Sequence, residues 1–295
     1  MSASIHPDTV LGAVKLKISN LAQSLSFYTE VIGLRILEQT STTAALAADG
    51  KTALILLEQI PDAIVAPERR GTTGLYHYAL LLPSRKELGI VLKRLIAHRI
   101  PLGQADHLVS EALYLSDPDH NGIEIYADRP RSEWKRDVNG DYVMATDPID
   151  WEGLLQEAGE EDITTGLPPE TIMGHVHLHT VGIPESRAFY NGLLGFDIVG
   201  DYTQMRALFV SAGGYHHHIG LNVWAGIGAP APSSRSTGLD YFTIVYPDSG
   251  ELSSALERLL AAGISVEQQD GAAFVTDPSS VRIKLTTRLV QQNNR

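Results

Sequence analysis

The sequence predicts an α+β fold in which four βαβββ units pair into two cup-shaped half-barrels. The main observation is an internal repeat: residues 11–36 align without a gap with residues 173–198, and residues 74–100 align with residues 238–264. The second observation is the order of patterns in each repeat, a short apolar strand followed by a helix of about three turns. Three further strands follow, separated by Gly, Asp or Asn turns. Because one such unit leaves the concave face of its sheet open, the units are expected to pair.

The first unit starts at the N-terminus. The apolar residues 14–18 predict a strand, and residues 23–32 predict a helix that ends at Gly33. The three returning strands are expected within residues 34–58. This unit sets the pattern for the other three.

The remaining units repeat that pattern, and their helices stop at a proline or a glycine. Unit two covers residues 75–127 and has a helix over 85–98 that ends before Pro101. Unit three covers residues 172–225. Unit four covers residues 239–288 and has a helix over 250–262 that stops at Gly263. We therefore divide the chain into residues 8–128 with units one and two, a linker over 129–170, and residues 171–290 with units three and four. The linker, which holds Trp134 and Trp151, is expected to contain one short helix.

The pairing of units decides which side chains meet. If neighbours along the chain pair, neither cup collects a complete set of metal ligands. If unit two pairs with unit three and unit one with unit four, one cup is a metal cup and the other is a structural cup. The metal cup then holds His77, Glu124 and His175, and the structural cup holds the equivalent residues Tyr241, Lys284 and Ala13.

Two imidazoles and one carboxylate form the ligand set of a metal site with open coordination positions. Strand alternation supports their inward direction, because His175, His177 and His179 share one face while the intervening apolar residues can face the helices. A buried carboxylate without a partner is costly, so a cation is expected beside Glu124. The alternative is that these histidines line a solvated strand face.

Composition excludes several classes of function. The 23 basic and 35 acidic residues leave a net charge of −12, which argues against nucleic acid or an anionic membrane as a partner. Cysteine is absent, so a metal would be held by nitrogen and oxygen. Without a signal peptide pattern or a long apolar run, we expect a cytoplasmic protein, and a homo-oligomer is compatible with this composition.

Two motifs resemble a known family. The pattern G-H-V-x-L followed by A-F-Y-x-x-L-L-G-F, over residues 174–196, and residues 117–126 (DPDHNGIEIY) are similar to the vicinal oxygen chelate superfamily. That superfamily includes extradiol catechol dioxygenases, glyoxalase I, and bleomycin and fosfomycin resistance proteins. Residues 77–83 (HYALLLP) and 121–130 (NGIEIYADRP) most resemble a two-domain bacterial branch of the catechol 2,3-dioxygenases.

The resemblance implies roles for particular residues. In extradiol enzymes the ligands are a His on the first strand of one unit and a His and a Glu on the first and last strands of its partner, positions matched by His175, His77 and Glu124. Tyr114, ten residues before the glutamate, matches a tyrosine that hydrogen-bonds the substrate. His107 matches a histidine on the preceding hairpin, although the hairpin is shorter here. In familiar extradiol enzymes all ligands come from the C-terminal pair of units, whereas here they span the linker.

The resemblance also implies an acid/base histidine at the start of the last strand of the unit that carries His175. Comparison through Ile219 selects His217. Strand alternation disagrees: if the apolar residues of that strand face the helices, so does His217, while His216 and His218 face the cup unless a bulge resets the register. We favour His217 and keep His218 as the alternative.

The reaction implied by the resemblance is extradiol ring cleavage of a small aromatic diol by dioxygen, with Fe(II) as the cofactor and Mn(II), Ni(II) or Zn(II) as alternatives. An open two-histidine, one-carboxylate site leaves room for a bidentate catecholate beside dioxygen. A glyoxalase-like isomerase or lyase is the competing enzyme class, but it usually has a fourth protein ligand, and the position equivalent to Glu124 falls near Gly220. A non-catalytic drug-binding resistance protein is the third hypothesis.

Overall fold

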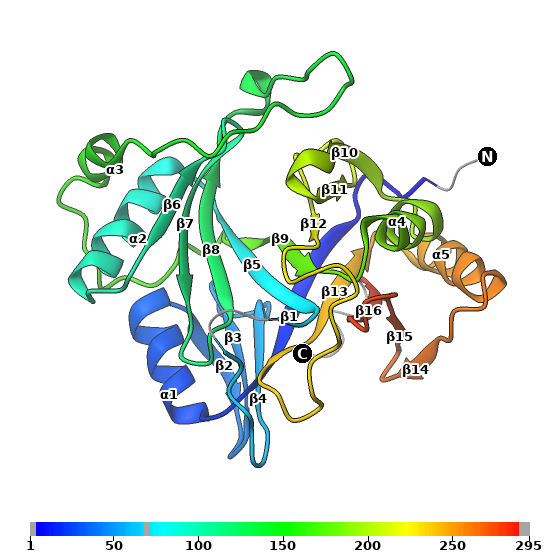
Figure 1. The fold of residues 1–295 in the computed structure, drawn as a ribbon. Coiled ribbons are helices and arrows are strands. Elements are labelled where there is room, and N and C mark those ends of the chain that lie inside the picture. The colour runs from blue at the N-terminus through cyan, green and yellow to red at the C-terminus, as the bar shows by residue number, and fades with distance from the viewer. Residues whose placement is uncertain (1–3, 68–70, 289–295) are drawn as a thin grey trace.

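The structure is a computed structural model that describes residues 4–67 and 71–288. In these residues sixteen strands form two curved sheets of eight strands each, with helices packed against them (Figure 1). The α+β class with two half-barrels, as predicted, is confirmed. No helix in this part of the chain combines the length and the apolar character that a membrane span requires.

The first sheet is built from units one and four. At its centre β1 and β13 pair antiparallel, with Val14 opposite Phe242. The strand order is β14-β15-β16-β13-β1-β4-β3-β2. The strands are β1 (Val10–Ile18), β2 (Arg35–Gln39), β3 (Thr43–Ala47), β4 (Ile55–Gln59), β13 (Gly238–Tyr246), β14 (Glu267–Gln269), β15 (Ala272–Thr276) and β16 (Arg282–Thr287).

The second sheet is built from units two and three. Its central strands β5 and β9 pair antiparallel, with His77 opposite His177. The strand order is β10-β11-β12-β9-β5-β8-β7-β6, which is the order of the nested pairing of units. The strands are β5 (Gly74–Leu82), β6 (Gly103–Asp106), β7 (Ser110–Ser116), β8 (Gly122–Asp128), β9 (Ile172–His179), β10 (Asp197–Tyr202), β11 (Ala207–Ser211) and β12 (Ile219–Asn222).

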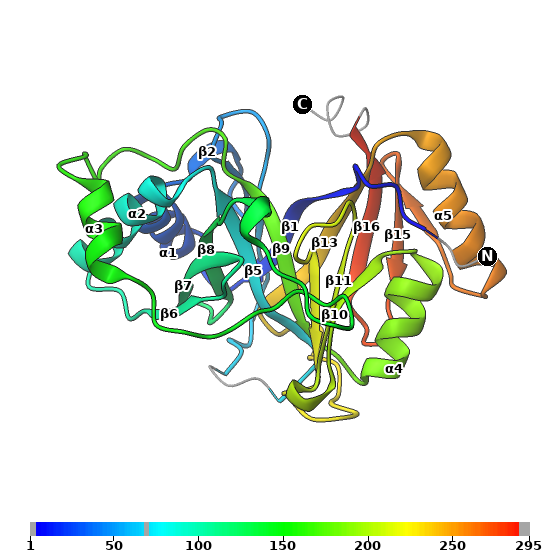
Figure 2. The same cartoon turned by 90° about the horizontal axis from the view of Figure 1, so that it is seen from above.

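The helices of units one and two gather on one side of the molecule and those of units three and four on the other (Figure 2). Buried apolar residues of both sheets and of these helices form one continuous core. The helices are α1 (Leu21–Ser26) continued by the π-helical η1 (Phe27–Ile32), α2 (Arg85–Ala97), α4 (Ile183–Ser186) continued by the π-helical η3 (Arg187–Leu193), and α5 (Ser249–Ala261). The linker adds α3 (Trp151–Ala158) and the short turn η2 (Arg131–Glu133), and η4 (Thr203–Met205) follows β10.

The first helix differs most from its predicted bounds. It begins at Leu21, two residues earlier than expected, because the side chain of Asn20 caps it by accepting a hydrogen bond from the backbone N–H of Gln23. Its second half widens into a π-helix, and it ends at Gly33 with φ of 93°. The helices α2 and α5 lie within one residue of the predicted bounds, and the expected linker helix is α3.

Two arginines at equivalent positions close the ends of these π-helices. Arg94, on α2, donates to the carbonyl of Ile32 at 2.8 Å, to that of Ile163 at 2.7 Å, and to that of Thr165. Arg258, on α5, donates to the carbonyl of Leu193 at 2.8 Å. These side chains satisfy carbonyls that the helix ends leave without intrahelical partners. Through the carbonyls of Ile163 and Thr165, Arg94 also connects the linker to α2.

Candidate metal centre

Three neighbouring strands of the second sheet place a carboxylate and two imidazoles together. Glu124 on β8 lies with its Oε2 3.0 Å from Nε2 of His77 on β5 and 3.0 Å from Nε2 of His175 on β9. The two Nε2 atoms are 3.3 Å apart. All three side chains are buried. Within the described part of the chain these three residues form the group able to hold a metal ion.

The strand register explains this convergence. Ala79 on β5 is paired with Glu124 on β8 and with His175 on β9. Residues paired across neighbouring strands point to the same face, and His77, two residues before Ala79, shares that face. The alternation predicted for His175 therefore brings it to the concave side with the other two donors.

The protonation states suit metal binding. Burial alone would raise the pKa of Glu124, but the attraction and hydrogen bonds of His175 and His77 outweigh it and hold that pKa well below its ordinary value. Burial lowers the pKa of His77, and this effect exceeds the opposing attraction of Glu124. A carboxylate beside neutral imidazole is the form in which these side chains ligate a metal.

The donor spacing fits one divalent ion. Metal–ligand bonds of about 2.1 Å place cis ligands about 3.0–3.4 Å apart. The three separations of 3.0, 3.0 and 3.3 Å have this size. One ion could therefore contact all three donors on one side and keep its other positions open. Nδ1 of His175 is buried without a hydrogen-bond partner among the described residues, so the ring is held by packing and by its Nε2 contacts.

Tyr114 and His107 form a hydrogen-bonded pair beside the three donors. Tyr114 on β7 is paired directly with Glu124 on β8. Its hydroxyl lies 2.6 Å from Nε2 of His107, whose Nδ1 lies 2.7 Å from the carbonyl of Ala145. A carbonyl can only accept, so Nδ1 carries the proton of neutral His107 and Nε2 accepts from the Tyr114 hydroxyl. Burial, with the charge of Glu124, raises the pKa of Tyr114 well above its ordinary value and keeps it a phenol.

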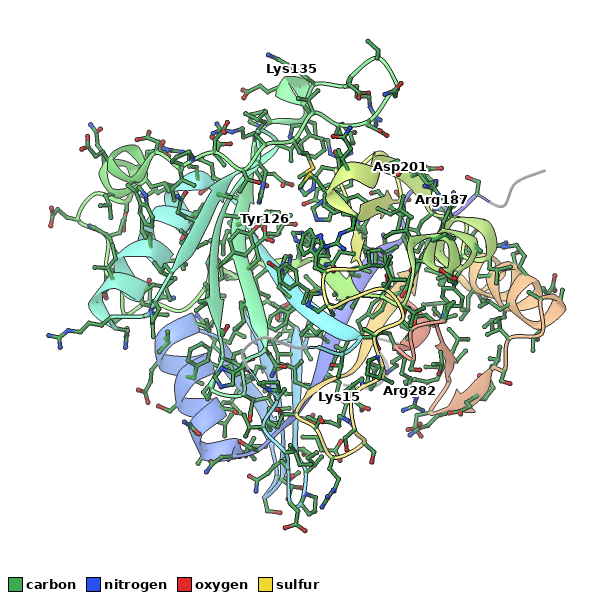
Figure 3. All side chains as sticks on the ribbon, viewed as in Figure 1. Lys15, Tyr126, Lys135, Arg187, Asp201 and Arg282 are labelled. Carbon is green, nitrogen blue, oxygen red and sulfur yellow. The ribbon has the colours of Figure 1, made fainter. Side chains whose placement is uncertain are left out.

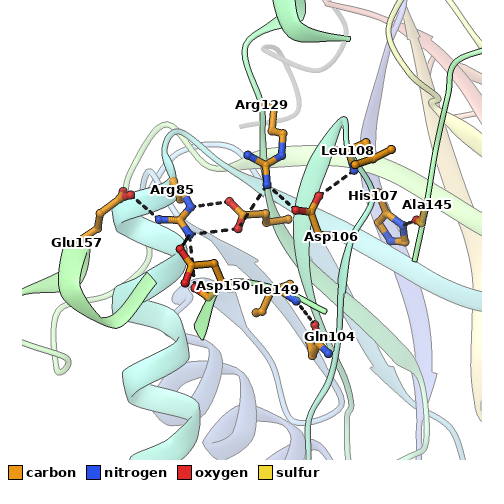
Figure 4. Close-up of polar contacts among 11 residues, drawn as sticks. Arg85, Gln104, Asp106, His107, Leu108, Arg129, Ala145, Ile149, Asp150 and Glu157 are labelled. Carbon is orange, nitrogen blue, oxygen red and sulfur yellow. Dashed lines mark hydrogen bonds and ion pairs between the residues drawn. The ribbon is translucent and has the colours of Figure 1, made fainter. Parts of the chain in front are cut away.

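The linker holds the hairpin that carries His107 (Figure 4). Arg85 on α2 forms ion pairs with Glu111 on β7 and with Asp150 and Glu157 of the linker. Arg129, just after β8, pairs with Asp106 at 2.6 Å. Contacts from three separate segments therefore fix the hairpin, and the linker carbonyl that orients His107 was not foreseen from the sequence.

His217 is the histidine of the 216–218 triplet whose ring packs against a proposed metal ligand. Its ring centroid is 4.1 Å from that of His175, and the ring also stacks on Phe209 with centroids 4.5 Å apart. Residues 215–218 are an irregular, bent segment, and strand β12 begins only at Ile219, so alternation does not apply to the triplet. This is why simple alternation selected the other two histidines.

The other two histidines of the triplet point elsewhere. His216 Nε2 donates to Oδ1 of Asp128 at 2.9 Å, and its Nδ1 lies 2.8 Å from Nδ1 of His217. If His216 is neutral, its proton is on Nε2 and its Nδ1 can only accept. His217 then donates from Nδ1, which leaves its own Nε2 unprotonated. His218 accepts at Nδ1 from the backbone N–H of Ala212 at 3.2 Å, and burial lowers its pKa to about 3. Of the two candidates for the acid/base, His217 is the one beside the donors.

Aromatic side chains surround the site, and sequence reasoning missed two of them, Tyr76 and Trp224. Tyr126, two residues after Glu124, packs on His175 with ring centroids 4.9 Å apart (Figure 3). Tyr76 contacts the rings of His77 and His177 at 5.0 and 5.2 Å, and Trp224 contacts Tyr76 at 5.2 Å. Alternation with Glu124 predicted the inward direction of Tyr126. Tyr76 directly precedes His77 at a register shift of β5, and Trp224 follows β12, so neither of these residues gave a local sign.

A cavity of about 700 Å³ opens beside the three donors. His77 and Tyr114 line it together with Tyr76, His179 and Trp224. This volume is typical of a small-molecule site, and the ring faces of the two exposed aromatic residues suit a flat apolar ligand. The arrangement can therefore hold a metal ion on the three donors and a small aromatic molecule beside His77 and Tyr114.

Comparison with known proteins agrees with this geometry. The family model described as "Glyoxalase/Bleomycin resistance protein/Dioxygenase superfamily" matches residues 10–125 and 172–285. A protein of Bacillus subtilis (strain 168) named "Catechol-2,3-dioxygenase" is 57% identical over 94% of this chain and 96% of its own length. Among solved structures, a putative dioxygenase from Bacillus subtilis matches with a TM-score of 0.67 at 14% identity, covering 97% of this chain and 86% of its own. Glyoxalase I from Zea mays matches with a TM-score of 0.59 at 13% identity, covering 97% and 95%. At these identities the structural matches support the fold alone.

Proposed function

The chain belongs to the glyoxalase/bleomycin resistance protein/dioxygenase superfamily, and we propose that it is an extradiol dioxygenase that uses Fe(II) to cleave the ring of catechol or a related aromatic diol. The observation that carries the proposal is the buried group of His77, Glu124 and His175 next to the 700 Å³ aromatic-lined cavity. Its donors occupy one side of the site, which leaves positions for two oxygen-bearing reactants.

Each neighbouring residue has a task in this reaction. When bound, Fe(II) would hold the diol beside dioxygen and supply the redox chemistry of ring cleavage. His217, neutral and unprotonated at Nε2, would accept a proton from a ring hydroxyl and later return it to the departing oxygen. Tyr114 would hold the diol through its hydroxyl, whose own proton is directed to His107. Tyr76 and Trp224 would pack on the ring and exclude water.

A glyoxalase-like isomerase is the second candidate, and one contact argues against it. Such an enzyme usually has a fourth protein ligand, which would stand near Gly220 on β12. Gly220 is paired with His177 on β9, and a Cβ added at Gly220 would lie 2.8 Å from Cγ of that imidazole. A carboxylate side chain therefore has no room there. A resistance protein that only binds drugs does not need a complete set of metal ligands.

The test is an oxygen-dependent assay with purified protein. The protein is loaded with Fe(II) without oxygen, mixed with catechol or 3-methylcatechol, and exposed to oxygen while the visible spectrum is recorded. Glu124→Ala removes one donor, and Glu257→Ala, at an exposed position of α5, is the matched control. Metal content is measured for each variant.

We expect a yellow semialdehyde product from the wild type and the control, dependent on iron, and neither product nor stoichiometric iron in Glu124→Ala. Bound iron without a product from either diol would contradict the dioxygenase proposal and favour an isomerase. Equal iron binding by Glu124→Ala and the wild type would contradict the ligand set itself.

A further inference from the structure

The concave face of the first sheet, formed by units one and four, also encloses a cavity. Its volume is about 440 Å³, and it is lined by Ala13, Tyr241 and Lys284, the positions that correspond to His175, His77 and Glu124 in the metal cup. On β13 and β16, Thr243 is paired with Lys284 as Ala79 is paired with Glu124 on β5 and β8. The ammonium group of Lys284 therefore takes the place that the metal-binding carboxylate has in the other cup. We call this cavity the second cup.

Lys284 has no counterion among the described residues. It is half-buried, and among residues 4–67 and 71–288 no carboxylate oxygen lies within 4.0 Å of its Nζ. Burial lowers the pKa of Lys284, and this effect outweighs the more distant attraction of Asp270. A charged group taken partly out of water without a partner is costly.

The neighbouring cations of the same sheet are neutralised. Lys15 on β1 lies 2.5 Å from Oε2 of Glu58 and 3.2 Å from Oδ2 of Asp240. Arg282, two residues before Lys284 on β16, lies 3.2 Å from Oε2 of Glu267 (Figure 3 labels Lys15 and Arg282). Of these three cations, Lys284 lines the cavity and has no acidic partner in the part of the chain that the structure describes.

A second unsatisfied donor lies next to it. Thr286, two residues further on β16, shares the concave face with Lys284 and also lines the second cup. It is 2% exposed, and its Oγ1 has no hydrogen-bond partner in the described part of the chain. The nearby Thr243 differs, because its hydroxyl donates to the carbonyl of Ala13 at 2.8 Å. Buried polar atoms in native structures normally have partners, so the Thr286 hydroxyl, next to the half-buried ammonium of Lys284, indicates a missing acceptor.

The rest of the lining is largely apolar. Leu56 packs with Tyr241 and Phe274, whose rings meet edge to face at a centroid distance of 5.3 Å. Leu37, Ala45 and Ala53 add further apolar surface. Glu38 is the one carboxylate of the lining, and it is exposed, as is Lys51. The cavity thus combines an apolar body with one half-buried cationic end.

We propose that the second cup binds a small organic monocarboxylate, with its carboxylate on Lys284 and Thr286 and its apolar body against Leu56 and Tyr241. A carboxylate oxygen would accept from the ammonium and from the threonine hydroxyl together, in a charge-assisted contact. The volume accommodates a molecule of the size of an aromatic acid. The proposal is independent of the metal centre and of the reaction proposed for it.

Benzoate, with benzyl alcohol as its uncharged counterpart, is the probe. Binding to the full chain is measured by isothermal titration calorimetry for the wild type, Lys284→Met and Thr286→Val. His77→Ala reports on binding in the metal cup, and Lys86→Met, a surface lysine paired with Glu161 elsewhere, is the control for loss of a positive charge. The melting temperature of each variant verifies the fold, and Lys284→Met is expected to stay folded because it removes an unpaired charge.

We expect benzoate to bind the wild type, Lys86→Met and His77→Ala alike, and to bind Lys284→Met at least about tenfold more weakly. Thr286→Val should show a smaller loss, and benzyl alcohol should bind much more weakly than benzoate. Absence of benzoate binding to the wild type at about 10 mM would overturn the proposal. Equal binding by Lys284→Met, or loss only in His77→Ala, would overturn it as well.

Discussion

The smallest side chains decide whether the three donors can meet. Ala79 lies between Glu124 and His175 in the sheet, and its methyl group leaves the space that both donors share. Gly174, next to His175, leaves room for Tyr126, which packs on that histidine, since a Cβ at position 174 would collide with the Tyr126 hydroxyl. A larger side chain at either position would force the donors apart, and a few tenths of an ångström matter at ligand distances.

Removing the hydroxyl of Tyr114 tests the proposed function at the level of a single residue. Tyr114→Phe should lower kcat/KM for catechol by about 10- to 100-fold, because it removes one hydrogen bond to a charged substrate without removing a metal ligand. Iron content should stay at the wild-type level. Steady-state oxygen uptake and metal analysis check this.

Tyr202→Phe is the control for Tyr114→Phe. It removes another well-bonded hydroxyl, 2.6 Å from the carbonyl of Tyr142, on the edge strand β10 and away from the three donors. Its kcat/KM should stay within about twofold of the wild type. A loss of iron in Tyr114→Phe, or an equal loss of activity in both variants, would show that Tyr114 has only a structural role.

Duplicated loops tie the two sheets together at the scale of elements. The hydroxyl of Tyr28, in unit one, donates to Oδ2 of Asp117 in the β7–β8 loop at 2.9 Å, and Tyr190, in unit three, donates to Oδ2 of Asp277 in the β15–β16 loop at 2.9 Å. Each aspartate also accepts two backbone N–H groups of its own loop through Oδ1. Since each tyrosine and its aspartate belong to different sheets, these bonds cross the common core.

The buried Asp277 should make stability depend on pH. Burial, opposed by hydrogen bonds from Val281, Tyr190 and Ser279, raises its pKa to about 6. An unfolded aspartate titrates near 4, so between about pH 4 and pH 6 the folded state holds a proton that the unfolded state releases. The contribution of Asp277 to the free energy of unfolding therefore falls by about 2–3 kcal/mol as pH rises from about 4 to above 6.

Asp277→Asn isolates this contribution. Denaturant unfolding of the wild type and the variant at about pH 4.5 and pH 7.5 gives the difference, which should favour the wild type more at the lower pH. Asp197→Asn, at an exposed position of β10, is the control and should follow the wild type. A wild-type minus variant difference that is the same at both pH values would contradict the prediction.

The whole molecule is one body because each sheet contains strands from both halves of the chain. The pairings β1–β13 and β5–β9, at the centres of the two sheets, both join the N-terminal half to the C-terminal half. The apolar core is likewise continuous over all four units. The linker over 129–170 is therefore not what holds the halves together.

Cutting the linker should leave the molecule assembled. A protease recognition sequence inserted at Val138, which is fully exposed, allows cleavage after folding. The two fragments should co-elute at the size of the intact chain in native buffer, because the central strand pairs and the core remain. They should separate in about 6 M guanidinium chloride. Separate elution in native buffer would show that covalent continuity of the linker is required.

Local patterns were sufficient for the four units and for the character of the site. The repeat predicted four βαβββ units, because similar sequence segments with the same turn residues adopt the same local backbone. Alternation predicted the inward face of His175, because it depends only on the geometry of a strand. The helix bounds near Asn20 were missed because a capping side chain outweighed the hydrophobic pattern.

Only the tertiary structure decided which units share a sheet, and with that whether His77, Glu124 and His175 meet. The pairing of β5 with β9 depends on packing summed over residues far apart in the chain, which no local pattern contains. The direction of His217 was decided in the same way, by its packing against Phe209 and His175 in an irregular segment to which strand alternation does not apply. The hydrogen-bonding partner of His107 comes from the linker, since Ala145 is brought to it only when the chain folds back over the hairpin.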